Sequence, residues 1–359
     1  MVMAFDASEV AARLAKARAG RVAIDSVSAS LDGFDLAAGY EVQRLLRREA
    51  GPLAGWKLGV TSRAKQAQVG VHEPVRGYLA AGDGLDLGSP LVVAEHIQPR
   101  AEPEIVFIMG SDLAGPVVSS SDVLAATASV AVGIEILDSR YADYKFTMPD
   151  VVADNTSAGR YLVGSAVPAA GLDLRLIGVV LEHNGEVTAT AAGAAALGHP
   201  AAAVAWLVRS LAAENEGLRA GDIVLSGGLT AAVPVKAGDV VTVTADRLGT
   251  VERSCICKAR TGPTSLPWCR SIGQRASRSG RSRTPGAPLP CSRCPASWLS
   301  PTAPARTTAA RWAQGWSATA WSPARGTGTA TSWPPGGAGR RPATSCAGTR
   351  WRWWTAVRT

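Results

Sequence analysis

The sequence predicts an α+β protein with a small helical N-terminal part, a mixed β-rich core and a C-terminal tail that we expect to be disordered. Helical apolar patterns occupy the first fifty residues, and strand-like alternation begins near residue 99. The composition then changes abruptly after Glu252. We therefore divide the chain into a helical N-terminal subdomain (1–90), a β-rich domain (91–252) and a low-complexity tail (253–359).

Two helices and one strand-like segment are predicted in the N-terminal part. Ser8 can cap a helix that runs through Arg18 and is stopped by Gly20, and Asp35 can cap a second helix over 36–50. The apolar residues of this second helix share one face, and they are Leu36, Tyr40, Leu45 and Leu46. The segment 55–62 is interrupted by glycines and has strand character.

Short segments with strand patterns follow one another through the second part. The predicted strands are 102–109, 130–137, 160–163, 176–183, 222–226 and 239–245. One helix interrupts them, because Pro200 suits a first helical turn and apolar residues follow at helical spacing before Gly217.

The charge of the chain is divided between its body and its tail. The formal net charge is +8, but all 29 acidic residues lie at or before Glu252. From Arg253 onward the chain is rich in Arg, Ala, Pro, Gly, Ser, Thr and Trp, and it contains all six cysteines. Because GC-rich DNA read in the wrong frame gives this composition, we interpret the tail as a frameshift product.

Two alternative functions of the tail remain open. Cys255, Cys257, Cys291 and Cys294 resemble the spacing of zinc ligands. Alternating Arg and Trp also resemble the pattern of single-stranded nucleic-acid binders. Both patterns arise easily in a scrambled reading frame, so we expect no nucleic-acid partner.

The body of the chain has the features of a protein from a reducing compartment. Residues 1–252 contain no cysteine, and no apolar run reaches the length of a membrane span. The N-terminus lacks the apolar stretch of a signal peptide. We expect a cytoplasmic protein without a membrane partner.

Three glutamates form a candidate metal site. Glu102 and Glu104 are two apart on a predicted strand, so their side chains project from the same face. Glu135 interrupts the apolar run 128–137, where an unpaired charge would be costly. Such close carboxylates repel one another unless a cation lies between them, and hard oxygen ligands suit Mg²⁺ or Mn²⁺. The alternative is an exposed strand face with solvated carboxylates.

Lys57 is a second candidate, because it lies in an apolar strand between Gly55 and Gly59. It could extend to the strand edge, or it could pair with a substrate carboxylate or move protons. The glycines favour the second interpretation, because they allow a ligand to approach the backbone.

Further polar residues follow Glu135. Asp138 could hold a metal ligand in place or pair with Arg140. Residues 154–157 form either an ordinary turn or a polar contact surface, and Gly227 and Gly228 could form a small anion-binding loop.

Several motifs together resemble the 2-keto-4-pentenoate hydratase / 4-oxalocrotonate decarboxylase family, within the wider fumarylacetoacetate-hydrolase-like fold. They are GWKLGVTSRAKQ (55–66), EPEIVF (102–107), EILDSRY (135–141), VVADNTSAGRYLVG (151–164), LGHPAAAVAWL (197–207) and AGDIVLSGGLT (220–230). The resemblance covers nearly all of residues 5–251. It implies a divalent metal on the three glutamates, which makes 91–252 a metal-binding catalytic domain. It also implies two catalytic residues, Lys57 and Ser157, and substrate contacts at Thr61, Ser62, Asn155 and Thr230.

The resemblance also separates two branches of the family. Hydratases carry an acidic residue in a PDYG-like segment, whereas this chain has Val75 at that position and Arg76 in place of an aromatic residue. The resemblance therefore implies metal-dependent decarboxylation of 2-oxo-3-hexenedioate in meta-cleavage degradation of aromatic compounds. The alternative is hydration of 2-hydroxypenta-2,4-dienoate. We expect a homo-oligomer and a complex with a sister hydratase.

Overall fold

The structure is a computed structural model that describes residues 5–62, 66 and 72–257. These residues lie in the first of two units into which the chain divides, Met1–Ala276. Most of the predicted tail, including Cys291 and Cys294, lies outside the described residues.

A mixed eight-stranded sheet forms the centre of this unit. Its main path has the order β2-β1-β12-β4-β6-β7, while β13 pairs with β4 and β8 pairs with β6. The strands are β1 (Leu53–Gly59), β2 (Val75–Ala80), β4 (Arg100–Met109), β6 (Thr127–Leu137), β7 (Ala158–Val163), β8 (Val167–Pro168), β12 (Ile223–Leu225) and β13 (Val233–Pro234). β1 and β12 are parallel, and the other pairs are antiparallel.

A second sheet has five strands in the order β10-β9-β14-β15-β3. They are β3 (Leu91–Val92), β9 (Gly178–His183), β10 (Glu186–Ala192), β14 (Val240–Ala245) and β15 (Gly249–Ile256). A short ladder joins β5 (Leu113–Ala114) to β11 (Gly217–Leu218). The predicted α+β class, with a β-rich core and few helices, is confirmed.

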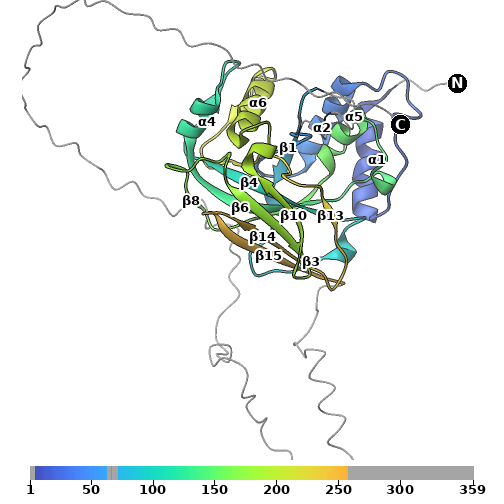
Figure 1. Cartoon of the computed structure of the whole chain (residues 1–359). Coiled ribbons are helices and arrows are strands. Elements are labelled where there is room, and N and C mark those ends of the chain that lie inside the picture. Colours follow the sequence, from blue (N-terminus) through green and yellow to red (C-terminus); the bar gives the residue numbers. More distant parts are fainter. Residues whose placement is uncertain (1–4, 63–65, 67–71, 258–359) are drawn as a thin grey trace, which may run out of the picture. The chain divides into compact units, whose positions relative to one another are not determined.

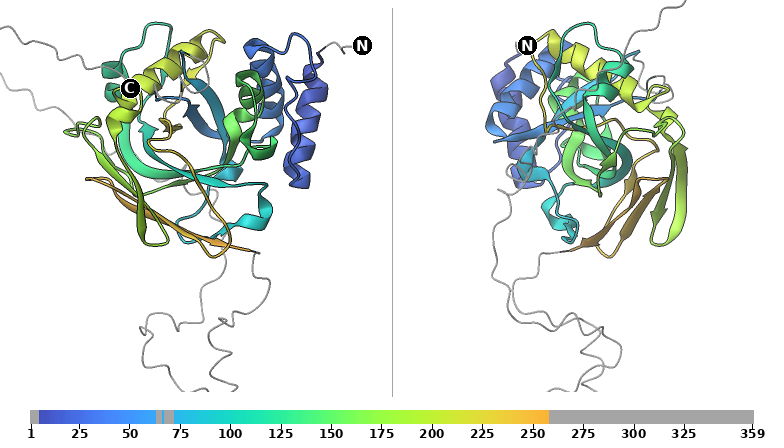
Figure 2. Two further views of the ribbon diagram at one scale, coloured as in Figure 1. Left: turned by 45° about the vertical axis from the view of Figure 1, so that its right-hand side comes forward. Right: turned by 90° about the vertical axis from the view of Figure 1, so that its left-hand side faces the viewer.

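The helices form two groups at the edges of the strands. α1 (Ala7–Gly20), α2 (Leu36–Glu49) and α5 (Met148–Ala153) lie side by side, whereas α4 (Ser120–Ala126) packs against α6 (Pro200–Ala212) (Figures 1 and 2). Single 3₁₀ turns are η1 (Ala81–Asp83), η2 (Val93–Glu95), η3 (Ala142–Tyr144), η4 (Asn155–Ser157) and η5 (Gly193–Ala195). Within the described part of the chain, no helix is long and apolar enough to cross a membrane.

Two details of the N-terminal helices differ from prediction. α1 begins earlier than expected, because Asp6 rather than Ser8 caps it and accepts hydrogen bonds from the backbone of Ser8 and Glu9. The predicted apolar stripe of α2 is confirmed only in part: Leu45 and Leu46 pack against the core, but Leu36 is exposed, and the fully buried residues are Ala38, Gly39, Val42 and Gln43. Small residues face inward there because α5 packs closely, and a side chain on Gly39 would collide with the Pro149 carbonyl. The predicted Asp35 cap is confirmed.

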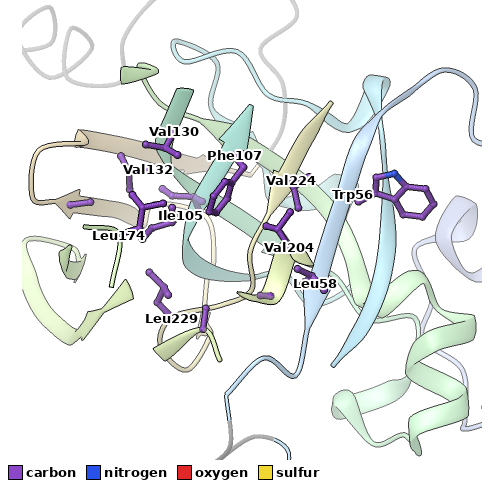
Figure 3. Packing of buried hydrophobic residues seen from close by; sticks show 14 of the residues in the cluster. Trp56, Leu58, Ile105, Phe107, Val130, Val132, Leu174, Val204, Val224 and Leu229 are labelled. Atoms are coloured by element: carbon purple, nitrogen blue, oxygen red, sulfur yellow. The ribbon is translucent and has the colours of Figure 1, made fainter. Parts of the chain in front are cut away.

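The main core fills the space between the two sheets and α6. Ile105 and Phe107 of β4 and Val130 and Val132 of β6 point into it, and Val204 meets them from α6 (Figure 3). Because side chains alternate along a strand, the intervening residues of β4 and β6 face the opposite side of the sheet. That opposite face carries the three glutamates.

The sheets include residues from both sides of the predicted boundaries. β1 and β2 belong to the central sheet although they precede residue 90. β15 continues past Glu252, and Cys255 is buried beside Leu91 of β3. The division into 1–90, 91–252 and 253–359 stays a proposal.

Candidate metal centre

Three buried glutamates converge from two neighbouring strands. Glu102 and Glu104 share one face of β4, and the register of the sheet pairs Glu102 directly with Glu135 of β6. One carboxylate oxygen of each lies within 4.8 Å of the others. Their exposed fractions are 7%, 1% and 1% for Glu102, Glu104 and Glu135, which excludes the alternative of a solvated strand face.

The carboxylates have oxygen atoms to spare for a cation. Within the described residues, no N–H or hydroxyl donor reaches Glu104 Oε1 or Glu135 Oε2, although both are buried, and the two carboxyl groups lie against each other. Burial, then the charge of Glu135, raises the pKa of Glu104 well above its ordinary value. Burial also raises the pKa of Glu135, against the opposing effect of Lys57. Buried oxygens without donors are costly, and a hard divalent cation would satisfy them, so these residues fit Mg²⁺ or Mn²⁺.

Gly227 and Gly228, which follow β12, lie against the glutamates. The Gly227 N–H donates to Glu104 Oε2 at 2.6 Å. A β-carbon on Gly228 would lie 2.1 Å from Glu102 Oε2, and one on Gly227 would lie 2.1 Å from Thr61 Oγ1. The predicted anion-binding loop thus binds a carboxylate of the protein itself. Gly227 requires glycine because its φ is 108°, whereas a side chain at Gly228 would displace the Glu102 carboxylate.

Lys57 joins the glutamates from β1. Its Nζ lies 2.9 Å from Glu135 Oε1 and donates to the Thr156 carbonyl at 3.1 Å. The side chain is 2% exposed, so it does not extend to the strand edge. The interpretation of its flanking glycines changes, because Gly55 admits the backbone of Ile223 rather than a ligand.

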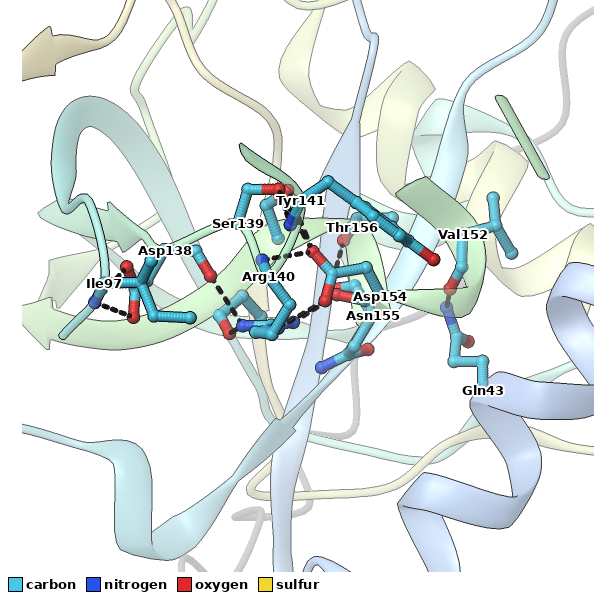
Figure 4. Close-up of polar contacts among 12 residues, drawn as sticks. Gln43, Ile97, Asp138, Ser139, Arg140, Tyr141, Val152, Asp154, Asn155 and Thr156 are labelled. Carbon is cyan, nitrogen blue, oxygen red and sulfur yellow. Dashed lines mark hydrogen bonds and ion pairs between the residues drawn. The ribbon is translucent and has the colours of Figure 1, made fainter. Parts of the chain in front are cut away.

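A buried ion pair between Arg140 and Asp154 precedes the residue whose carbonyl binds this lysine, Thr156 (Figure 4). Of the two alternatives for Asp138, the ion pair with Arg140 is not formed, because Arg140 pairs with the Asp154 carboxylate. Burial raises the pKa of Asp154 to about 6, although Arg140 opposes the shift. Asp138 accepts hydrogen bonds from the backbone of Ile97 and Gln98, at 2.9 and 2.8 Å. It thereby anchors the segment that leads into β4, which carries two of the glutamates.

The predicted catalytic serine and the predicted substrate contacts are buried or hydrogen-bonded within the protein. Ser157 is buried, with Oγ 3.5 Å from Asp154 Oδ2. Asn155 directs its amide to the backbone of β2, while Thr230 Oγ1 donates to the carbonyl of Ala231. Thr61 is 1% exposed, and Ser62 accepts a backbone hydrogen bond from Gln66. The catalytic and substrate-binding roles of these residues, and that of Asp138 behind the metal, stay predictions.

The Thr156 carbonyl is a part of the site that the sequence does not predict. A backbone group leaves no signal in the side-chain pattern, and its contact with Lys57 joins segments far apart in the chain. The one available signal was the polar run 154–157 itself.

Comparisons with known proteins agree with this geometry. Residues 61–255 match the family described as "Fumarylacetoacetate (FAA) hydrolase C-terminal". A 4-oxalocrotonate decarboxylase from Pseudomonas sp. (strain CF600) is 43% identical over 213 residues, 59% of this chain and 80% of that protein. A 2-hydroxypent-2,4-dienoate hydratase from Pseudomonas putida is 45% identical over 187 residues, 50% of this chain and 84% of that protein.

A solved structure is also similar. It is a 4-oxalocrotonate decarboxylase from Pseudomonas putida G7, complexed with magnesium and adipate. The TM-score is 0.68 at 38% sequence identity, and the match covers 70% of this chain and 99% of that chain.

Proposed function

The chain belongs to the fumarylacetoacetate hydrolase family, and we propose that it decarboxylates 2-oxo-3-hexenedioate (4-oxalocrotonate) to 2-hydroxypenta-2,4-dienoate with the help of a divalent metal. The observation that carries the proposal is the trio of buried glutamates with donor-free oxygens beside a buried lysine. Glu102, Glu104 and Glu135 would hold Mg²⁺ or Mn²⁺. The similar solved decarboxylase was complexed with magnesium and a six-carbon dicarboxylate, which supports this assignment.

The reaction develops negative charge on the substrate, and the site must stabilise it. Loss of CO₂ from C6 leaves an electron pair that moves through the C3=C4 bond onto the 2-oxo oxygen. Glu102, Glu104 and Glu135 would hold a divalent cation, which would supply Lewis-acid stabilisation for negative charge on that oxygen. Lys57 would orient a substrate carboxylate or hold the proton that completes the product. Ser157 would donate a hydrogen bond to the substrate.

The position of Val75 favours decarboxylation over hydration. Val75 pairs with Gly59, and Gly77, two residues later on β2, pairs with Lys57. Val75 therefore lies on the same face of the sheet as Lys57, and it is 3% exposed. An apolar side chain occupies the position where the resemblance to hydratases would require an acid.

Arg76 does not disturb the substrate side of this sheet. It donates to Glu214 at 2.5 Å and lies over the rings of Tyr40 and Trp56, towards the helices. The departure from the aromatic residue expected at this position thus affects packing on the opposite face.

The test supplies purified protein with each of two substrates. With 2-oxo-3-hexenedioate and Mg²⁺, we expect release of CO₂ and formation of the dienoate, and no reaction in excess chelator. With 2-hydroxypenta-2,4-dienoate, we expect no addition of water. Hydration of the dienoate without any CO₂ release from the dioate would establish the hydratase alternative instead.

The assembly and location of the protein are further proposals. Because the product is the substrate of a hydratase, a complex with such an enzyme would pass the unstable dienoate onward. We also propose a homo-oligomer, and a cytoplasmic location that suits the cysteine-free sequence up to residue 252. Light scattering on the protein alone and mixed with a hydratase tests both forms of assembly.

A further inference from the structure

Three consecutive residues beside Lys57 adopt an unusual backbone conformation. Asn155, Thr156 and Ser157 have φ angles of 48°, 51° and 58°. These values lie in the left-handed region, which residues other than glycine rarely adopt. Thr156 is β-branched, which makes this conformation particularly unfavourable for it. Such a turn persists only when its surroundings impose it, and strained turns of this kind cluster at functional sites.

Contacts on several sides hold this turn in place. Asn155 pairs with the backbone of Tyr78 in both directions, accepting from its N–H at 2.9 Å and donating to its carbonyl at 3.0 Å. The Ser157 carbonyl accepts from the N–H of Asp138 at 2.8 Å. Before the turn, the Arg140 guanidinium binds both the carboxylate and the carbonyl of Asp154 (Figure 4).

The neighbouring strand makes room for the turn. Gly77 lies opposite Lys57 in the pairing of β1 with β2. A β-carbon on Gly77 would lie 2.5 Å from Thr156 Oγ1 and 2.9 Å from the Asn155 carbonyl oxygen. The absence of a side chain at this position therefore lets the turn approach the lysine.

These contacts direct the Thr156 carbonyl towards Lys57. The Thr156 oxygen accepts a hydrogen bond from Lys57 Nζ at 3.1 Å, while Glu135 lies 2.9 Å from the same nitrogen. A lysine side chain has four rotatable bonds and a charge that attracts any nearby carboxylate. With a second, fixed acceptor, the ammonium is held in one place rather than drawn fully onto the glutamates.

We propose that the turn Asn155–Ser157 is a positioning device for Lys57, and that Asn155 acts through it rather than by touching the substrate. Asn155 fixes the turn to β2, and the turn presents the Thr156 carbonyl to the ammonium. The effect on turnover rests on the proposed function, whereas the effect on the lysine itself does not.

The test compares Asn155→Ala with a matched control, Asn184→Ala. Asn184 lies in the turn between β9 and β10 and also has a positive φ, of 57°. Its side chain forms hydrogen bonds with the Asp239 carboxylate and the backbone N–H of Val240. The control thus removes an equivalent side chain from a left-handed position away from the glutamates. If Asn155→Ala does not fold, Asn155→Gly carries the test, because glycine adopts positive φ freely while losing the same two hydrogen bonds.

Two readouts are measured on each variant. The first is the rate at which Lys57 is reductively methylated in metal-free protein without substrate, followed by peptide mass spectrometry. We expect this rate to rise about fivefold or more in Asn155→Ala and to stay unchanged in Asn184→Ala. The second is turnover with Mg²⁺, where we expect kcat to fall about tenfold or more while KM changes less than about threefold.

The outcomes separate this inference from the proposed function. A change in kcat or KM with unaltered methylation of Lys57 would mean that Asn155 meets the substrate directly, and the inference would be overturned. No change in either readout would overturn it as well. If the unaltered chain shows no decarboxylase activity and methylation still responds to Asn155→Ala, the proposed function fails and the positioning role stands.

Discussion

Replacing Glu104 by Gln separates metal binding from folding. The substitution keeps the shape of the side chain and an oxygen that can accept from the Gly227 N–H, but it removes one of three clustered charges. We expect the metal-free variant to be more stable than the metal-free parent, and we expect Mg²⁺ to stabilise only the parent. A residue with a purely structural role would give the opposite result, because its loss would destabilise the fold.

The expected magnitude follows from the spacing of the carboxylates. Oxygens of Glu104 lie within 4.8 Å of oxygens from Glu102 and Glu135. At that separation, two unit charges repel by about 3 kcal/mol at an effective dielectric constant of about 20. The raised pKa lets a proton relieve part of this repulsion, so we expect a gain of about 1–3 kcal/mol in the metal-free state. For a domain of this size that corresponds to a rise of about 3–10 °C in Tm.

Thermal unfolding with and without Mg²⁺ measures both effects. At 100 times its Kd, a ligand that binds only the folded state adds about 2.7 kcal/mol, and this gain should vanish in Glu104→Gln. Glu186→Gln, at an exposed position on β10, serves as the control and should respond to Mg²⁺ like the parent. A metal-free Tm below that of the parent, or an unchanged response to Mg²⁺, would refute the reasoning.

Three further predictions concern the same site. Because burial and neighbouring carboxylates raise the pKa of Glu104 above its ordinary 4.5, the metal-free fold keeps a proton that the unfolded chain has lost. Its stability should therefore fall as pH rises above about 4.5, while the gain from Mg²⁺ grows, as urea titrations across pH can show. Gly228→Ala would place a β-carbon 2.1 Å from Glu102 Oε2, so calorimetry should find Mg²⁺ affinity lowered about tenfold or more, whereas Gly82→Ala, in open space, should not change it. Val75→Asp would add a charge to the catalytic face, and decarboxylation should slow about tenfold or more, while Val75→Ile should retain most of the rate.

The sequence was sufficient to predict the glutamates as a cluster but not the arrangement around them. Alternation along one strand puts Glu102 and Glu104 on one face, and that prediction needs no tertiary information. The pairing of Glu135 with Glu102 depends on the register between β4 and β6, which are separated by α4. A shift of one residue would have turned Glu135 into the apolar core.

Contacts made by backbone and by glycine were the least predictable. Gly227 meets Glu104 only because β12 inserts between β1 and β4, far from its place in the sequence. The stripe on α2 was predicted only in part for a related reason, since hydrophobicity alone does not reveal that α5 approaches closely enough to require Gly39. Patterns of residue type report which side chains are apolar, whereas close approach of two backbones is decided by the partner element.

The measurement that tests the central claim most directly is the release of labelled CO₂ from 2-oxo-3-hexenedioate that carries ¹³C in its C6 carboxylate. We expect the full chain with Mg²⁺ to release the label as CO₂ in equal amount with the dienoate, and we expect chelator or Glu104→Gln to abolish the release. Label that stays in the organic product, or release that continues at full rate without a divalent metal, would contradict the account.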